Sequence, residues 1–443
     1  MALRWCDSIR LIAGNFISKC FFLFLRLIFL VLQSISWKIN GITNVTEKNR
    51  EKGSPVAQAF KKVAWNKYCF LLPPSLRDFI LEHDEYVDLD YVVQHDNICL
   101  FFFDPHQDVV VFAEAEPGRV LWKSSSDSFV TMSQYKHAER LIVMRMADFH
   151  KLCATLPDPT KSVIIMGNTG RCGSTLLTQV YEYSNKVISI SEPYPLNNLA
   201  VMYRQKGFSS EVLQMTRSII RMYCRPHKCV PNPEGYLLKP TGPSLACTAP
   251  ITKLYPQTKT FYLYRQMNNV AKSMYKMSFF LPTMRCTYFF SRFSGNLTEM
   301  LFEKTSLPTE GTNRTVTNDH SASIFQAAVA TKMYRMMRDD GHQVWGLLFD
   351  DIMADKPLAV RAIFKASGLP ESLVTDALKA FERDSQTDSV VSMEKLSKIK
   401  PLEYTKEDQE ESSKILEELG FPRLDQDCHL EGTMDFKEVL GMK

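Results

Sequence analysis

A glycine-rich stretch near residue 170 has the composition of an anion-binding loop. The preceding residues 162–166 read SVIIM, a short apolar run bounded by turn residues, which predicts a buried strand. Residues 167–175 read GNTGRCGST, and apolar residues follow them at helical spacing. A strand, a glycine-rich turn and a helix in this order aim free backbone N–H groups at a phosphate or sulfate. The candidate anion ligands in this loop are Gly170, Arg171, Cys172, Gly173, Ser174 and Thr175.

The side chains of this loop extend the prediction. Ser174 and Thr175 can donate hydroxyl hydrogen bonds, and Arg171 adds a forked cation. An ATP-binding loop of the form G-x-x-x-x-G-K-[ST] has a Gly-Lys pair before the hydroxyl residue, and no such pair precedes Ser174. The sequence therefore disfavours ATP–magnesium chemistry. An ordinary strand–helix turn with incidental glycines is the alternative.

A second segment could bind another phosphate. Residues 259–264 (KTFYLY) predict a buried strand that ends at Arg265, and Ser273 follows eight residues after that arginine. An arginine at the carboxyl edge of a strand and a serine on the next helix can bind one phosphate together. The alternative is a surface arginine and an unrelated helical serine.

These segments resemble the sulfotransferase superfamily, whose donor is 3′-phosphoadenosine 5′-phosphosulfate. Residues 171–175 (RCGST) match the family's 5′-phosphosulfate loop position by position, and Arg265 with Ser273 matches its 3′-phosphate site. A third element, a strand with an acidic pair and a helix ending in Gly-Leu-Pro, is similar to residues 345–370. The match covers roughly residues 161–372 in order, and it is closest in style to the membrane-anchored Golgi sulfotransferases. Two departures are QMN at 266–268, where charged and proline residues are common, and a cysteine within the loop.

The resemblance implies an in-line transfer of a sulfuryl group to a hydroxyl of a glycan or protein acceptor, with no metal. It makes Arg171 the loop cation, and it places Lys239 about where the protein-tyrosine branch has a second catalytic lysine. Glu192 lies 21 residues after Arg171, the spacing of the base glutamate in that branch. The run ISIS before Glu192 predicts a strand, so the carboxylate should emerge beside the loop. A glutamate that only caps or orders the loop is the alternative.

His227 is the reserve base, since cytosolic sulfotransferases use a histidine. It lies between Cys224 and Cys229, which could form a disulfide in an oxidising compartment or remain unpaired. Two other functions stay open. One is a P-loop nucleotide kinase with Asp350 and Asp351 as metal ligands, and the other is a catalytically silent sulfotransferase-like binding protein.

The elements that must position these residues predict an α/β fold. Residues 161–443 alternate strand-like and helix-like segments, which favours a parallel sheet flanked by helices, as in the P-loop-like core of sulfotransferases. We expect an anchor and stem over 1–50, a mixed α/β extension of unknown role over 51–158 and the sulfotransferase-like domain over 159–443. Three short strands are expected in the extension, near 99–103, 109–113 and 140–144.

The N-terminus predicts a membrane anchor. Residues 16–37 contain only two charged residues, Lys19 and Arg26. A central arginine opposes insertion by roughly 2.5 kcal/mol, whereas the 14 Leu, Ile, Phe and Val residues favour it by about 6 kcal/mol. Arg4 and Arg10 before the segment favour a cytoplasmic N-terminus and a single-pass type II protein with the rest of the chain on the lumenal side. The resemblance to Golgi sulfotransferases implies that the membrane is that of the Golgi and that the lumenal part is catalytic. A cleaved signal peptide and a buried or interfacial helix are the alternatives.

Composition is that of an ordinary globular protein. Of the 443 residues, 45% are hydrophobic and 23% are charged, which excludes a disordered or fibrous chain. The net charge of +4 gives no reason to expect a nucleic-acid partner. The 11 cysteines include no CxxC pair, which disfavours a zinc ribbon or a thioredoxin-like site. Glycosylation triplets begin at Asn44, Asn296 and Asn313.

Overall fold

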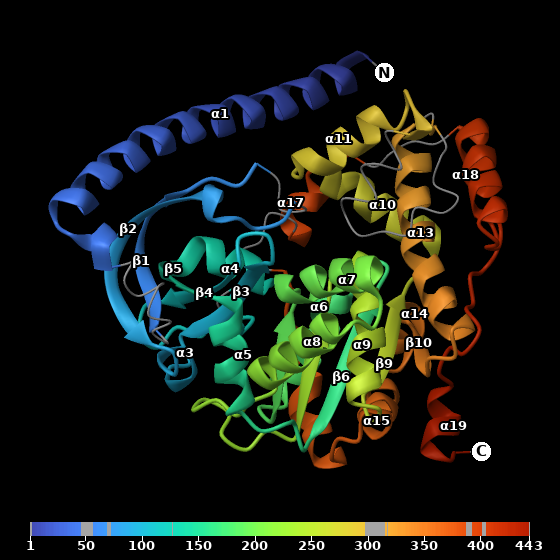
Figure 1. The fold of residues 1–443 in the computed structure, drawn as a ribbon. Helices are drawn as coiled ribbons and strands as arrows, with labels where there is room; N and C mark the ends of the chain where they lie inside the picture. The colour runs from blue at the N-terminus through green and yellow to red at the C-terminus, as the bar shows by residue number, and fades with distance from the viewer. Residues whose placement is uncertain are drawn as a thin grey trace.

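The protein contains two β-sheets, a surrounding set of helices and one long N-terminal helix (Figure 1). The computed structural model describes residues 2–45, 56–68, 72–125, 127–296, 315–316, 318–386, 392–400 and 405–442.

The second sheet along the chain is parallel and carries the predicted anion loop. Its strands are β6 (Ser162–Asn168), β7 (Val187–Ser191), β8 (Gly235–Lys239), β9 (Lys259–Tyr264) and β10 (Val344–Leu348). The spatial order is β10-β9-β6-β8-β7, and all neighbouring strands are parallel. The order reverses at β6, because the next two strands lie on one side of it and the last two on the other. In open parallel sheets, ligands bind beyond the carboxyl ends of the strands at such a point.

Helices cover both faces of this sheet, so the predicted α/β fold with a flanked parallel sheet is confirmed (Figure 1). The α-helices are α6 (Ser174–Tyr183), α7 (Tyr194–Lys206), α8 (Ser210–Tyr223), α9 (Thr248–Leu254), α10 (Met267–Ser278), α11 (Pro282–Phe290), α13 (Asp319–Asp339), α14 (Phe349–Ala354), α15 (Lys356–Ser367), α16 (Val374–Leu378), α17 (Met393–Ser397), α18 (Lys406–Glu418) and α19 (Phe436–Leu440). Short 3-10 helices are η2 (Gly242–Cys247), η3 (Glu371–Leu373) and η4 (Lys379–Glu382). Gly368 caps the C-terminus of α15 with a left-handed φ of 72°, the usual role of glycine at a helix end.

The first sheet is antiparallel and lies within residues 56–144. Its strands are β1 (Val56–Trp65), β2 (Phe79–Asp88), β3 (Ile98–Asp104), β4 (Val109–Ala115) and β5 (Ala138–Met144), in the order β2-β1-β5-β4-β3. The associated helices are η1 (Leu76–Asp78), α3 (Tyr91–Gln94), α4 (Val130–His137) and α5 (Met146–Ala154). Strands β3, β4 and β5 lie where short strands are predicted. Strands β1 and β2 were not predicted, because charged residues at their exposed positions break up the apolar pattern.

The two sheets share one hydrophobic core. Phe101 and Phe112 of the first sheet belong to the same buried cluster as Ile165 and Ile190 of the second. Ile164 faces the opposite way and packs in a separate cluster with α6, α15 and α16. The chain passes from one sheet to the other near the expected boundary at residue 158, but the packing is continuous across it.

Helix α1 (Ala2–Ile39) lies outside this core, along β2 and α11 (Figure 1). Its segment Ser8–Ile39 is long and apolar enough to cross a membrane, and only 6% of its most apolar stretch is buried. Of the glycosylation triplets, Asn44 follows α1 and Asn296 follows α11, whereas Asn313 lies outside the described residues.

Candidate active site

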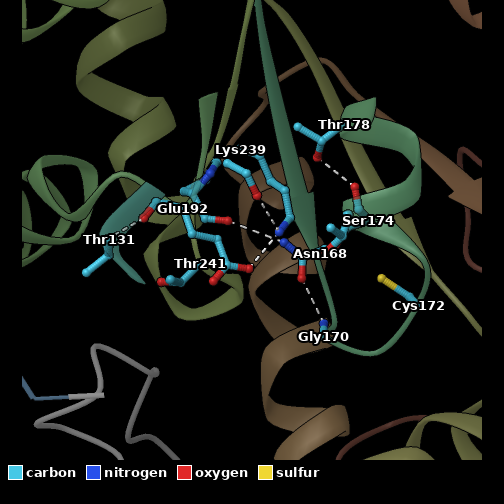
Figure 2. Close-up of polar contacts among 12 residues, drawn as sticks. Thr131, Asn168, Gly170, Cys172, Ser174, Thr178, Glu192, Lys239 and Thr241 are labelled. Atoms are coloured by element: carbon cyan, nitrogen blue, oxygen red, sulfur yellow. Dashed lines mark hydrogen bonds and ion pairs between the residues drawn. The ribbon is translucent and has the colours of Figure 1, made fainter. Parts of the chain in front are cut away.

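The predicted site residues lie at one edge of the parallel sheet. Arg171 follows β6, Glu192 comes directly after β7, Lys239 ends β8 and Arg265 comes directly after β9. Because these strands are parallel, their carboxyl ends meet at the same edge. Figure 2 shows Glu192 and Lys239 pointing toward one another beside the loop that leaves β6.

The loop after β6 has an unusual backbone. Gly170, Arg171 and Gly173 have φ values of 77°, 53° and 86°, so three of the four residues before α6 are left-handed. Asn168 orders the turn, because its Oδ1 accepts a hydrogen bond of 2.9 Å from the backbone N–H of Gly170. Its amide nitrogen also donates to Pro240 O at 3.3 Å. The first-turn N–H groups of α6, which have no partner within the helix, therefore face the edge of the sheet.

Arg171 connects the two segments that the sequence singles out. Its Nε donates to Ser273 Oγ at 2.8 Å, and its Nη1 donates to Gln386 Oε1 at 2.8 Å. Burial lowers the pKa of the Arg171 guanidinium, and repulsion from the nearby charge of Arg265 acts in the same direction. The residues predicted to bind the 5′-phosphosulfate and those predicted to bind the 3′-phosphate therefore lie together in one cationic cluster.

Arg265 has spare capacity to donate hydrogen bonds. Its guanidinium lies 5.3 Å from the centre of the Phe349 ring. Its Nε is 3.8 Å from Asp350 Oδ1, and both side chains of this pair are about one third exposed or more, so the attraction is weak. The same Nε is buried and has no hydrogen-bond partner among the described residues. Asp350 Oδ2 is likewise buried without a hydrogen-bond partner among the described residues, so this pair leaves hydrogen-bonding capacity unused on both sides.

Lys239 and Glu192 form a buried ion pair. The Lys239 side chain is 0% exposed, and its Nζ lies 2.6 Å from Glu192 Oε1 and 3.3 Å from Ser191 Oγ. The strand register places Ser191 opposite Lys239, and the Glu192 N–H donates to Lys239 O at 2.7 Å. Glu192 is 27% exposed, so its carboxylate reaches the surface of the site while it neutralises the lysine.

Arg171 and Glu192 both have a left-handed backbone. Four non-glycine residues in the described part of the chain have a positive φ, and the other two are Asp108 and Asn185. Aspartate and asparagine tolerate this conformation in turns, whereas arginine and glutamate seldom adopt it. Such strain is concentrated at functional sites.

Residues from the first-sheet region complete the site, although the sequence assigned that region no role. The Phe129 ring centre lies 5.3 Å from Lys239 Nζ, and Thr131 Oγ1 donates to Glu192 O at 2.9 Å. Gln386, from the other end of the chain, contacts Arg171. These three residues are far from the loop in the sequence and match no local motif, so no signal in the sequence pointed to them.

Cys172 has a different position from that expected of an anion ligand. Its side chain is fully buried and its Sγ lies 3.3 Å from Leu263 O, beneath the loop. Burial raises the pKa of this thiol. Only the backbone of Cys172 is therefore available to an anion.

The contacts of His227 differ from those of the other candidate site residues. Its ring packs 5.2 Å from Trp122, and its Nδ1 lies 3.4 Å from Asp96 Oδ1. Burial lowers the pKa of His227. In the part of the chain that the structure describes, no contact joins His227 to Glu192 or Lys239. The neighbouring Cys224 and Cys229 are free thiols, the first buried and the second exposed.

A surface pocket of about 440 Å³ lies elsewhere, between α5, α8 and α9. Its lining includes His150 and Arg221 but none of the predicted site residues. Within the described ranges, no group of three or more His, Cys, Asp or Glu side chains is arranged to hold a metal ion.

No model of a known protein family matches the chain, and no curated protein matches it significantly. The site must therefore be interpreted from its own geometry.

We predict that Gly173→Ala disrupts the loop. An added Cβ would lie 2.1 Å from the Phe349 ring, and the φ of 86° is unfavourable for alanine. The matched control is Gly118→Ala, which has a φ of 90° and nothing within 4 Å of the added atom. Chemical denaturation should show a loss of about 1 to 3 kcal/mol more for Gly173→Ala than for the control. Equal losses would show that the loop has room and that Phe349 does not close it.

Proposed function

We propose that the protein transfers a sulfuryl group from 3′-phosphoadenosine 5′-phosphosulfate to a hydroxyl group of a glycan or protein acceptor. One observation carries the proposal: a cationic cluster and a buried Lys–Glu pair meet at the carboxyl edge of the parallel sheet, next to the first turn of α6. The sequence resemblance to sulfotransferases supports the same activity.

The cationic cluster fits a donor with two anionic groups. Arg171 and the N–H groups at the start of α6 would bind the 5′-phosphosulfate. Arg265 and Ser273 would bind the 3′-phosphate, since Arg265 Nε is buried without a hydrogen-bond partner among the described residues. The Ser273 hydroxyl accepts from Arg171 and can still donate its own proton to a phosphate oxygen. The contact of Arg171 with the neutral Gln386 would give way to the stronger charge-assisted contact with the donor.

Glu192 and Lys239 would catalyse the sulfuryl transfer. The acceptor oxygen forms a bond to sulfur as the bond between sulfur and the 5′-phosphate oxygen breaks, and the acceptor proton moves to Glu192. The electron pair of the broken bond leaves with the phosphate. Protonation of Glu192 removes the charge that neutralises Lys239, which lies 2.6 Å away. The lysine cation then becomes available to stabilise the departing phosphate at the moment its negative charge develops.

The first test of the proposal is donor binding and transfer. Arg265→Ala should lose a charge-assisted contact worth roughly 1.5 to 3 kcal/mol and weaken binding of 3′,5′-bisphosphoadenosine by about 10- to 100-fold in calorimetry. Arg292→Ala, which removes another partly buried arginine outside this cluster, is the control and should leave the affinity unchanged.

Unchanged affinity for the bisphosphate in Arg265→Ala would show that Arg265 does not bind the donor.

Transfer is tested separately. Incubation of the unaltered protein with radiolabelled donor and panels of glycans and peptides should label an acceptor. Donor binding without transfer to any acceptor would indicate a silent binding protein, and magnesium-dependent phosphate transfer from ATP would indicate a kinase.

We predict that Glu192→Gln lowers turnover by about 10²- to 10⁴-fold while bisphosphate affinity is retained, because glutamine keeps the shape but cannot accept the proton. The substitution also leaves the buried Lys239 without its counter-ion, so unfolding must be measured beside activity. In the Glu192→Gln/Lys239→Met double variant the unpaired charge is gone, so stability should recover but turnover should not.

Recovery of turnover in the double variant would show that Glu192 acts only as a counter-ion. If Glu192→Gln keeps near-normal turnover and His227→Ala loses it, the base is His227.

We propose that the protein is located at the Golgi membrane, with its body in the lumen. The membrane is supported by the long apolar helix α1, and the lumenal side by the three glycosylation triplets. The basic tail before α1 favours a single-pass type II arrangement with a cytoplasmic N-terminus. The packing of α1 favours instead the arrangement proposed below, in which both chain ends lie on the same side as the body.

We predict that the full-length protein in cells carries N-linked glycans, because its body is exposed to the lumenal glycosylation machinery. Glycosidase digestion should increase its electrophoretic mobility. Replacing Asn44, Asn296 and Asn313 with Gln should abolish the shift. An untreated protein that already runs like this triple variant would contradict the lumenal location.

A further inference from the structure

Helix α1 presents a regular polar stripe to the body of the protein. Lys19, Arg26 and Gln33 are seven residues apart, which is close to two helical turns, so they lie along one side of the helix. Phe22, at 8% exposure the most deeply buried residue of this stretch, lies on the same side. The side of α1 that faces the protein therefore contains both charged residues of the apolar segment.

This polar stripe binds the open edge of the first sheet. Arg26 Nε donates to Phe79 O at 2.9 Å, and Gln33 Nε2 donates to Leu81 O at 2.5 Å. Phe79 and Leu81 are two residues apart on β2, so their carbonyl groups point to the same edge of the strand. Strand β2 is the outer strand of its sheet and pairs with β1 on its other side. The helix thus satisfies carbonyl groups that an uncovered edge would leave to water or to another chain.

Lys19 completes the stripe with an ion pair. Its Nζ lies 2.8 Å from Asp78 Oδ1, and Lys67 Nζ lies 2.7 Å from Asp78 Oδ2. Burial alone would raise the pKa of Asp78, but the charges and hydrogen bonds of Lys67 and Lys19 hold it below its usual value. At the other end of the helix, Trp37 stacks on Phe60. The helix is therefore held along its length by side chains that suit the surface beneath them.

The opposite side of α1 is apolar and exposed. The large exposed residues of this side are Ile17, Phe21, Phe24, Ile28, Val31, Leu32, Ile35 and Ile39. A continuous apolar face of this size is unfavourable in water and marks a contact with a membrane or another protein. Because the segment has the length and hydropathy of a membrane helix, the occupant that it fits is the acyl region of a bilayer.

A helix that crosses the bilayer could not keep these contacts. In a crossing helix that spans residues 16–37, Lys19 would lie near the face of the membrane opposite to the body, roughly 30 Å from it. Its ion pair with Asp78 would then be broken, and the central Arg26 would lose its acceptor. We infer that α1 attaches the protein by lying in the plane of the membrane, with the polar stripe on β2 and the apolar side among the lipids. This inference does not depend on the proposed transfer activity.

A zero-length carbodiimide cross-link tests the inference on the full-length protein in intact membranes. The reagent joins a lysine to a carboxylate in direct contact, and mass spectrometry identifies the linked peptides. Lys67–Asp78 should form in either arrangement and serves as the internal control, whereas Lys19–Asp78 should form only if α1 lies on the body. Detection of the Lys67–Asp78 link without the Lys19–Asp78 link would overturn the inference.

The location of the two chain ends gives a second measurement. Glycosylation acceptor tags added before residue 1 and after residue 443 should have the same fate, because an in-plane helix keeps both ends on one side. The Lys19→Leu/Arg26→Leu/Gln33→Leu variant removes the polar stripe and should move the N-terminal tag to the other side. The matched control, Phe21→Leu/Ile28→Leu/Ile35→Leu, has the same spacing on the lipid side and should behave like the unaltered protein. Tags on opposite sides in the unaltered protein would establish a crossing helix instead.

Discussion

Lys239 has a positive charge at a point that solvent does not reach, and the surrounding structure must neutralise it. An unpaired ammonium group in a protein interior is unfavourable by several kcal/mol. The Glu192 carboxylate meets this requirement only because β7 and β8 are parallel neighbours whose register sets Ser191 opposite Lys239. The turn after β7 and the contact from Thr131 of α4 then fix the glutamate in place. One ion pair thus links the order of the sheet, the strained turn and the packing of the first-sheet region on the second.

Much of the parallel sheet could be predicted from the sequence. Most of its strands are buried on both faces and read as short apolar runs, and candidate site residues follow them directly. Arg171, Glu192, Lys239 and Arg265 lie at the edge of the sheet where a parallel arrangement should place them. The first sheet was harder to predict. Strands β1 and β2 are partly exposed, and their charged residues interrupt the apolar pattern that would have revealed them.

The remaining features depend on contacts between distant parts of the chain. Phe129 and Gln386 reach the site from segments that no local pattern connects to the loop. Cys172 occupies a loop position, but its side chain points into the core, which spacing alone could not reveal. Arg26 entered the sequence argument as a cost of membrane insertion. Its seven-residue spacing from Lys19 was the informative signal. That spacing could not be interpreted from the sequence, because the groups that both side chains contact lie on and beside the edge strand β2.

The left-handed backbone at Arg171 and Glu192 sets a limit on how this protein can evolve. Each such residue costs roughly 1 to 2 kcal/mol, in a fold whose net stability is expected to be about 5 to 15 kcal/mol. Glycine at either position would relieve the strain but would remove a side chain on which the site depends. Selection for heat resistance alone would therefore favour substitutions that impair the chemistry at these two positions. Lineages under such selection should accumulate stabilising changes in the distant helices and loops and leave the two strained turns unchanged.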